Sequence, residues 1–168
     1  MTTSKKSAQT VILGIDPGYG RLGYAVLEKT GSKEILLDYS CVVTNPKDSH
    51  GKRILAIAKE IEKVIKKHKP DVLAIEKLFF TKNQKTALAV SEVKGVVIYL
   101  ATKNDLQIAE YTPLEIKSSV CGYGKADKEQ IKKMVDLIIK PQITPKYDDT
   151  YDAIAICLTH SSHFGNNK

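Results

Sequence analysis

Several features that would place this chain in a special class are missing from its sequence. No apolar run approaches the roughly 20 residues of a membrane-spanning helix. Residues 1–10 are polar and lack the apolar centre of a secretory signal. The three cysteines, Cys41, Cys121 and Cys157, are isolated, with no C-x-x-C pair. This spacing argues against a disulfide framework or a zinc site and favours reduced thiols. We therefore expect a cytoplasmic protein.

The length and charge of the chain further limit its domain organisation and the kind of partner it can have. At 168 residues it has room for one domain. We expect this domain at residues 11–162, between flexible tails at 1–10 and 163–168. Lys and Arg number 26 against 19 Asp and Glu, giving a net charge of +7 and a pI near 9.2. Such a balance favours a polyanionic partner, either nucleic acid or an anionic membrane. The charge alone fits a merely basic, soluble protein equally well.

Hydrophobic patterning predicts an α/β fold. Short apolar runs of strand length predict strands at residues 11–15, 23–27, 35–43, 72–75 and 106–109. Helical spacing and end signals predict helices at residues 52–67, 86–101, 113–121, 128–139 and 147–161. The first three strands have short links, which indicates an antiparallel meander. The whole order predicts a mixed five-stranded sheet with helices on both faces.

Two acidic residues end predicted strands. Asp16 ends the first strand and Glu76 ends the fourth. If these strands are parallel neighbours, the two side chains meet at the edge where α/β sheets bind ligands. The alternative for Asp16 is a turn residue before Pro17-Gly18. Glu76 must reach solvent, pair with a cation such as Lys77, or bind a ligand.

Two further carboxylates begin the last predicted helix. Asp149 and Asp152 are three residues apart, so they share one helix face. Acidic residues are also favoured at helix N-termini, which explains Asp148 and Asp149 without any site. Asp152 is harder to explain in this way, because the apolar residues 153–158 follow it directly.

Together the four carboxylates indicate a metal site. Four clustered carboxylates repel one another unless cations neutralise them. Oxygen ligands select Mg²⁺, Mn²⁺ or Ca²⁺ over zinc. Two such ions about 3.5–4 Å apart suit in-line attack on a phosphodiester.

An ordered set of motifs resembles the RuvC family of Holliday-junction resolvases over residues 11–160. The matching residues are Ile12-Leu13-Gly14-Ile15-Asp16-Pro17-Gly18, Gly23-Tyr24-Ala25, Ala74-Ile75-Glu76, Phe79, Lys82-Asn83, Lys117, Gly122, Gly124, Lys128, Asp149, Asp152-Ala153-Ile154-Ala155-Ile156 and Thr159-His160. Two positions depart from the common pattern. Some relatives carry histidine where this chain has Asp149, and many carry glutamine where it has Lys77.

The resemblance implies an RNase H-like fold and a crossover junction endodeoxyribonuclease of DNA recombination and repair. It implies a homodimer that makes paired symmetric nicks in four-way DNA junctions and works with the RuvA–RuvB branch-migration complex. It also implies Mg²⁺, with two ions per active site and Mn²⁺ able to substitute. The catalytic and metal-binding residues would then be Asp16, Glu76, Asp149 and Asp152.

The resemblance also implies DNA contacts around the carboxylates. Phe79 would stack on unpaired bases near the crossover, whereas core packing is the simpler explanation for Phe80. The polar residues expected on DNA are Lys82, Asn83, Lys85, Lys117, Lys125 and Lys128. By contrast, we expect Lys63, Lys66 and the other lysines of residues 63–69 to form the solvated face of a helix.

Three other functions compete with a resolvase. The residues Gly14–Gly18 and Gly23 also resemble a phosphate loop of actin-like ATPases and sugar kinases, which need two such domains. A DNA-binding module that does not cut would have no use for four carboxylates. A related nuclease could act on RNA. Cleavage assays on junction DNA, duplex DNA and structured RNA would separate these alternatives.

Overall fold

The computed structural model describes residues 9–78, 84–140 and 145–164. The strands are β1 (Gln9–Asp16), β2 (Arg21–Thr30), β3 (Lys33–Val43), β4 (Val72–Glu76) and β5 (Gln107–Tyr111). The helices are α1 (His50–His68), α2 (Gln84–Lys103), α3 (Pro113–Cys121), α4 (Lys128–Ile139) and α5 (Asp148–Phe164). Each predicted element is present. Most differ from the prediction by a few residues at the ends, because strand pairing and helix packing extend an element beyond the residues whose pattern predicted it.

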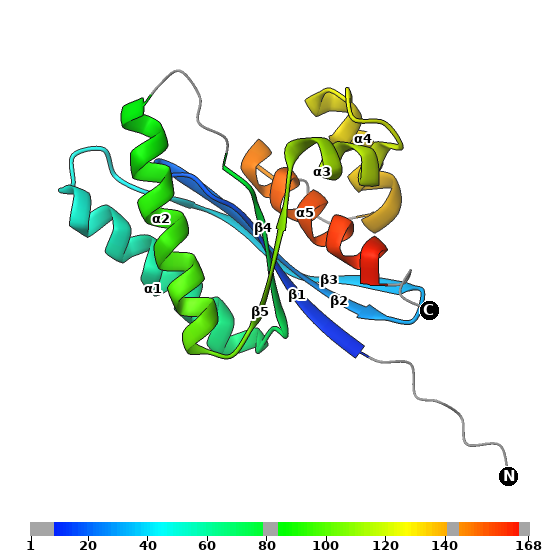
Figure 1. Ribbon diagram of the computed structural model, residues 1–168, viewed down its shortest axis with the longest axis horizontal. Coiled ribbons are helices and arrows are strands. Elements are labelled where there is room, and N and C mark those ends of the chain that lie inside the picture. Colours follow the sequence, from blue (N-terminus) through cyan, green and yellow to red (C-terminus); the bar gives the residue numbers. More distant parts are fainter. Residues whose placement is uncertain (1–8, 79–83, 141–144, 165–168) are drawn as a thin grey trace, which may run out of the picture.

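The strands form one mixed sheet in the order β3-β2-β1-β4-β5, which confirms the predicted sheet (Figure 1). β1, β2 and β3 form the expected antiparallel meander. β4 pairs parallel with β1, and β5 pairs parallel with β4. β1 is therefore the central strand, with a parallel neighbour on one side and an antiparallel neighbour on the other.

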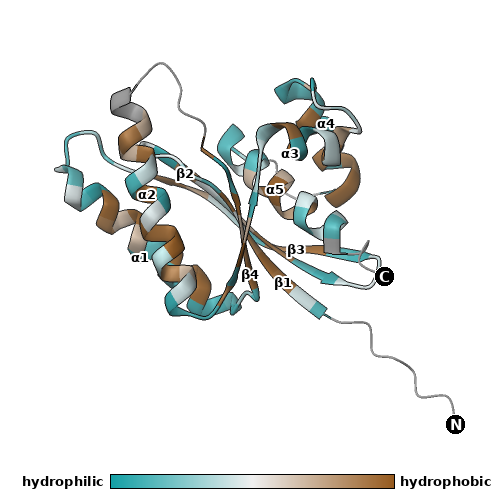
Figure 2. Ribbon diagram, in the orientation of Figure 1, coloured by the Kyte–Doolittle hydropathy of each residue, from teal (hydrophilic) through white to brown (hydrophobic). Residues whose placement is uncertain are grey.

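Helices cover both faces of the sheet, as predicted. α1 and α2 lie on one face, while α5, flanked by α3 and α4, covers the other (Figure 1). Side chains alternate along each strand. In β1, Leu13 and Ile15 join the core under α1 and α2, while Ile12 joins the core under α5. Figure 2 shows the hydrophobic sides of the helices turned toward the sheet.

The helix ends follow the local chemistry of the sequence. Thr112 and Glu115 form a capping box at the start of α3, and Gly122 ends that helix in the left-handed conformation. Asp127 caps α4 and forms a second capping box with Gln130. Cys157 is fully buried, as expected of a small core residue. None of the described helices is long and apolar enough to cross a membrane.

Candidate active site

Asp16 and Glu76 lie side by side at one edge of the sheet. β1 and β4 are parallel, with Ile15 opposite Ile75, so the next residues along the two strands are neighbours. Both side chains lie on the α5 face, because Ile12 and Ala74, an even number of positions earlier, pack into the core beneath α5. This arrangement confirms the parallel pairing on which the predicted site depends.

Two glycines bring α5 close to the sheet. A Cβ atom on Gly23 would lie 1.8 Å from the carbonyl oxygen of Asp149. One on Gly14 would lie 2.5 Å from the carbonyl oxygen of Ala153 and from Sγ of Cys157. Since Gly23 pairs with Asp16 across β1 and β2, the first turn of α5 stands directly over the end of β1. Glycine at these positions thus places Asp149 and Asp152 above Asp16.

The carboxylates act on one another electrostatically. The pKa of Asp16 is raised to about 8, first by burial and then by the charges of Asp152, Glu76 and Asp149 in that order, while Lys128 opposes the rise. Burial is also the main cause of the raised pKa of Glu76, with Asp152 second. The pKa of Asp152 is raised in the same way, by burial first. The carboxylates are therefore too close together and too buried for all of them to carry a negative charge without a cation nearby.

Two basic side chains offset part of this charge. Arg21 Nε lies 3.1 Å from Asp149 Oδ2, and Lys128 Nζ lies 4.0 Å from Asp152 Oδ2. Asp149 Oδ2 is buried and accepts no hydrogen bond from any described residue, so its contact with Arg21 is one of charge alone. Over residues 9–78, 84–140 and 145–164, no three His, Cys, Asp or Glu side chains meet in a ready-made metal centre.

The residues present nevertheless fit a hard divalent cation. All four acidic groups offer oxygen ligands, and oxygen is what Mg²⁺ and Mn²⁺ prefer. A buried carboxylate oxygen without a hydrogen bond, such as Asp149 Oδ2, is a group that a cation would satisfy. For all four side chains to hold one site, they would have to move closer together, and Asp149 would have to leave Arg21.

A cavity of about 260 Å³ opens beside the carboxylates, between α3, α4 and α5. Its lining residues are Glu76, Pro113, Ile116, Lys117, Lys128, Ile131, Asp152 and Ile156. Two predicted DNA-contacting lysines, Lys117 and Lys128, therefore stand with two of the carboxylates in one cavity. Lys125 is exposed in the loop that precedes α4, away from this lining.

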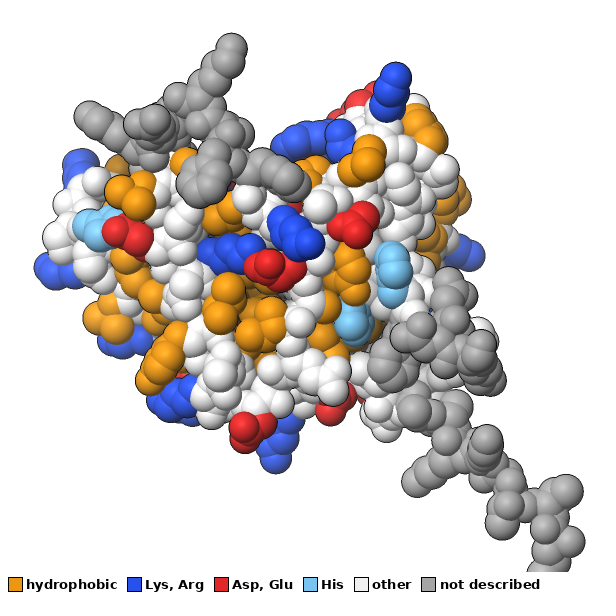
Figure 3. Space-filling view, viewed as in Figure 1, with side chains coloured by type: hydrophobic (Ala, Val, Ile, Leu, Met, Phe, Trp, Pro, Cys, Tyr) orange, Lys and Arg blue, Asp and Glu red, His pale blue; other side chains and the backbone are white. Residues whose placement is uncertain are grey.

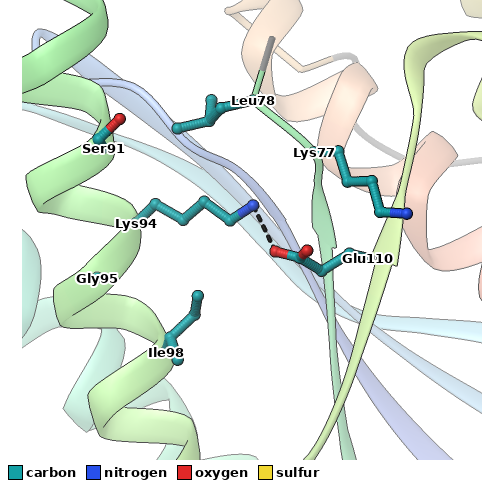
Figure 4. Close-up of a pocket in the computed structure, with 7 residues that line it drawn as sticks. All are labelled: Lys77, Leu78, Ser91, Lys94, Gly95, Ile98 and Glu110. Atoms are coloured by element: carbon teal, nitrogen blue, oxygen red, sulfur yellow. Dashed lines mark ion pairs between the residues drawn. The ribbon is translucent and has the colours of Figure 1, made fainter.

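Lys94 supports Glu76 from the opposite side, and sequence reasoning missed it. Only 12% of its side chain is exposed. Its Nζ donates to the backbone oxygen of Glu76 at 3.2 Å and pairs with Glu110 of β5 at 2.5 Å. Figure 4 shows Lys94 reaching from α2 toward Glu110 at the edge of a cavity of about 430 Å³. A lysine between the apolar residues Val93 and Val96–Val97 of a mostly apolar helix was the available signal.

Some predicted contacts fall outside the described residues. These are Phe79, Lys82 and Asn83, together with Phe80. Lys85 lies in the first turn of α2, but its side chain is outside the description. On the remaining prediction for lysines, Lys63, Lys66 and Lys67 have side chains 73%, 69% and 62% exposed, as expected of a solvated helix face.

Comparisons with known proteins agree with this geometry. A family model described as "Crossover junction endodeoxyribonuclease RuvC" matches residues 12–160. A protein of that description from Petrotoga mobilis is 46% identical over 152 residues, which is 90% of this chain and 93% of the relative. Another, from Ruminiclostridium cellulolyticum, is 43% identical over 152 residues, 90% of this chain and 92% of the relative.

Solved structures show the same similarity. T. thermophilus RuvC in complex with a Holliday junction substrate aligns with a TM-score of 0.87 at 30% identity, over 93% of this chain and 95% of that one. The yeast mitochondrial Holliday junction resolvase Ydc2 aligns with a TM-score of 0.66 at 15% identity, over 97% of this chain and 85% of that one. The second likeness concerns the fold alone.

Proposed function

The chain belongs to the RuvC family of crossover junction endodeoxyribonucleases, with their RNase H-like fold, and we propose that Asp16, Glu76, Asp149 and Asp152 carry its catalysis. It is an endonuclease that resolves four-way DNA junctions. The observation that supports the proposed residues is the meeting of the β1 and β4 ends beneath the first turn of α5. We propose Mg²⁺ as the cofactor, two ions per site, with Mn²⁺ as a substitute.

Each side chain has a task that its position suits. The four carboxylates would hold the ions, which when bound activate the attacking water and steady the leaving 3′ oxygen. Lys117 and Lys128 face the cavity that contains Glu76 and Asp152. A lysine there would neutralise charge that develops on the scissile phosphate in the transition state. Lys94 would keep the end of β4, and thus Glu76, in place.

We also propose a division of labour among the DNA contacts. Lys82, Asn83, Lys85 and Lys125 would hold phosphates and position the strand without reading its sequence. Phe79 would stack on bases at the crossover, a contact worth about 1–3 kcal/mol per base. Phe79→Ala should therefore slow cutting more than it weakens general DNA affinity. An unchanged cutting rate would assign Phe79 to packing instead.

The decisive experiment is cleavage of a synthetic four-way junction in Mg²⁺. Wild-type protein should make paired nicks. Asp16→Asn should lose at least about a thousandfold in cutting rate, since the metal stabilises the charge of the transition state. The variant should still bind the junction. Asp148→Asn is the matched control. This neighbouring acid pairs with Lys132 at 2.8 Å and is not one of the proposed ligands, so the variant should cut at nearly the wild-type rate.

Two further conditions make the experiment specific. Ca²⁺ should support binding without efficient cutting, because its loose coordination positions water poorly. Matched duplex DNA and structured RNA should be cut far more slowly than the junction. Normal cutting by Asp16→Asn, or equal rates in Ca²⁺ and Mg²⁺, would contradict the proposed metal site.

We propose that the chain acts as a homodimer joined through α2 and β5. Paired nicks in a two-fold symmetric junction call for two active sites. Leu88 and Tyr99 of α2 are 65% and 61% exposed, and Ile108 on the edge strand β5 is 40% exposed. Figure 3 shows hydrophobic side chains gathered on the face that carries these elements. A symmetric interface would cover them.

Sedimentation tests the dimer directly. Wild-type protein should sediment as a dimer, and Tyr99→Glu should shift it toward monomer, whereas Leu114→Glu, an equally exposed apolar site on α3, should not. A monomeric wild type would contradict this interface. The partnership with RuvA–RuvB and the cytoplasmic location stay predictions from the family resemblance and from the sequence.

A further inference from the structure

Arg21 stands at the rim of the carboxylate group. It begins β2, at the same sheet edge where β1 ends with Asp16. It lies two residues before Gly23 and four before Ala25, which packs into the core under α5, so its side chain is on the α5 face. The side chain is 53% exposed. It therefore borders both the acidic site and the surface from which DNA would approach.

The guanidinium of Arg21 is held loosely. Its Nε lies 3.1 Å from Asp149 Oδ2 without forming a hydrogen bond. It also lies over the ring of Tyr147, at 5.6 Å from the centroid. Within the described residues it has no other polar partner, although a guanidinium offers five N–H donors.

The chain's second arginine shows what a structural arginine looks like. Arg53 Nε donates to Thr44 Oγ1 at 2.9 Å, and its terminal nitrogen donates to the backbone oxygen of Tyr19 at 3.4 Å. Its guanidinium stacks on the Tyr19 ring at 3.7 Å. These contacts fix Arg53 in one orientation. Arg21 has none of them except a more distant aromatic neighbour, so it is free to exchange partners.

We propose that Arg21 is an exchangeable partner of Asp149 that turns to a phosphate of the bound DNA strand when Asp149 becomes a metal ligand. The proposal rests on the proposed nuclease function. Before metal binds, Arg21 supplies positive charge to a buried carboxylate oxygen that has no hydrogen bond. Once a divalent ion takes that oxygen, the guanidinium is released at the rim, where its planar fork matches a phosphate.

Two measurements on Arg21→Gln test both halves of this exchange. Mn²⁺ binding without DNA, measured by calorimetry, should tighten about three- to fivefold, the size of a lost competing ion pair. Junction binding in Ca²⁺ should weaken, and its dependence on salt should fall by about one phosphate contact. Arg21→Lys should bind Mn²⁺ like wild type but bind the junction more weakly, because an ammonium lacks the fork.

Lys117→Gln is the matched control for Mn²⁺ binding. It also removes one positive charge near the carboxylates, but Lys117 makes no ion pair with a described acidic residue. Its effect on Mn²⁺ affinity should be smaller than that of Arg21→Gln. Equal effects, or Arg21→Gln with unchanged Mn²⁺ affinity or an unchanged salt dependence, would overturn the exchange. A wild type that does not bind the junction would instead overturn the proposed function.

Discussion

The two faces of the sheet are covered in different ways. On one face, α1 packs through large side chains, with Ile57, Ile61 and Ile65 buried and lysines turned outward. On the other face, α5 packs through small residues against Gly14 and Gly23. Side chains separate helix from sheet in the first case, and backbone nearly touches backbone in the second. The closely packed face is the one that carries the carboxylates.

This contrast shows on which face the position of the helix must be precise. Large interdigitating side chains can adjust to a small change by shifting rotamers. A helix seated on glycines has no such adjustment, so a change there moves the helix and the acidic residues on it. Substitutions on the α5 face should therefore alter the chemistry, and comparable ones on the α1 face should not.

Of the substitutions that compare how the two faces are packed, Gly23→Ala should give the largest effect. Its Cβ atom would lie 1.8 Å from the carbonyl oxygen of Asp149, so the start of α5 must shift. A displacement of about 1 Å at a catalytic group costs on the order of 100-fold in rate. Junction cleavage by folded protein measures it. Gly51→Ala on α1 is the matched control, since its Cβ meets nothing within 4 Å, and it should cut normally.

Lys94→Met should have the next largest effect. This variant tests whether α2 also supports the site. Loss of the bonds to Glu76 and Glu110 should slow cutting about tenfold, the cost of a charged hydrogen bond at a positioning residue. Lys94→Arg should recover most of this rate. The Mg²⁺ concentration at half-maximal rate should rise for Lys94→Met, whereas a purely structural lysine would change only thermal stability.

The stability of the metal-free protein should depend on pH through the α5 face. The pKa of Asp16 rises from 3.8 to about 8 on folding, so the folded chain binds more protons between these values. The free energy of unfolding should therefore decrease as pH rises across this window. Thermal unfolding in EDTA should show the decrease, Asp16→Asn should reduce it, and Mg²⁺ at pH 8 should offset it. Equal pH profiles for Asp16→Asn and wild type would contradict it.

Lys63→Gln should have the smallest effect. Lys63 is 73% exposed on the outer side of α1, and its one ion pair with a described residue is with Glu60, at 3.6 Å. Exposed pairs of this kind contribute about 0–1 kcal/mol. Melting temperature, junction affinity and cutting rate should all match wild type. A clear loss of junction affinity would extend the DNA-binding surface onto α1 and blur the contrast between the two faces.

The same contrast explains how far sequence reasoning reached. The continuous apolar run around Leu13 and the helical period around Ile61 predicted their elements, because such patterns are local properties of the sequence. Asp16 and Glu76 could be paired because ends of parallel strands meet at one edge. The partners of Arg21 and Lys94 could not be predicted, since they lie 128 and 16 residues away and depend on how the helices pack on the sheet. Gly14 and Gly23 set the distance between α5 and the sheet, but in the sequence they look like ordinary turn or strand residues.

The position of α5 also has a consequence for the order in which the protein is made. Asp149 and Asp152 belong to the last helix of the described chain, and they complete a site begun by Asp16 in the first strand. A nascent polypeptide still on the ribosome can form the sheet without possessing a full set of acidic ligands. Nuclease activity that depends on all four carboxylates, as proposed, therefore requires synthesis to pass α5 first.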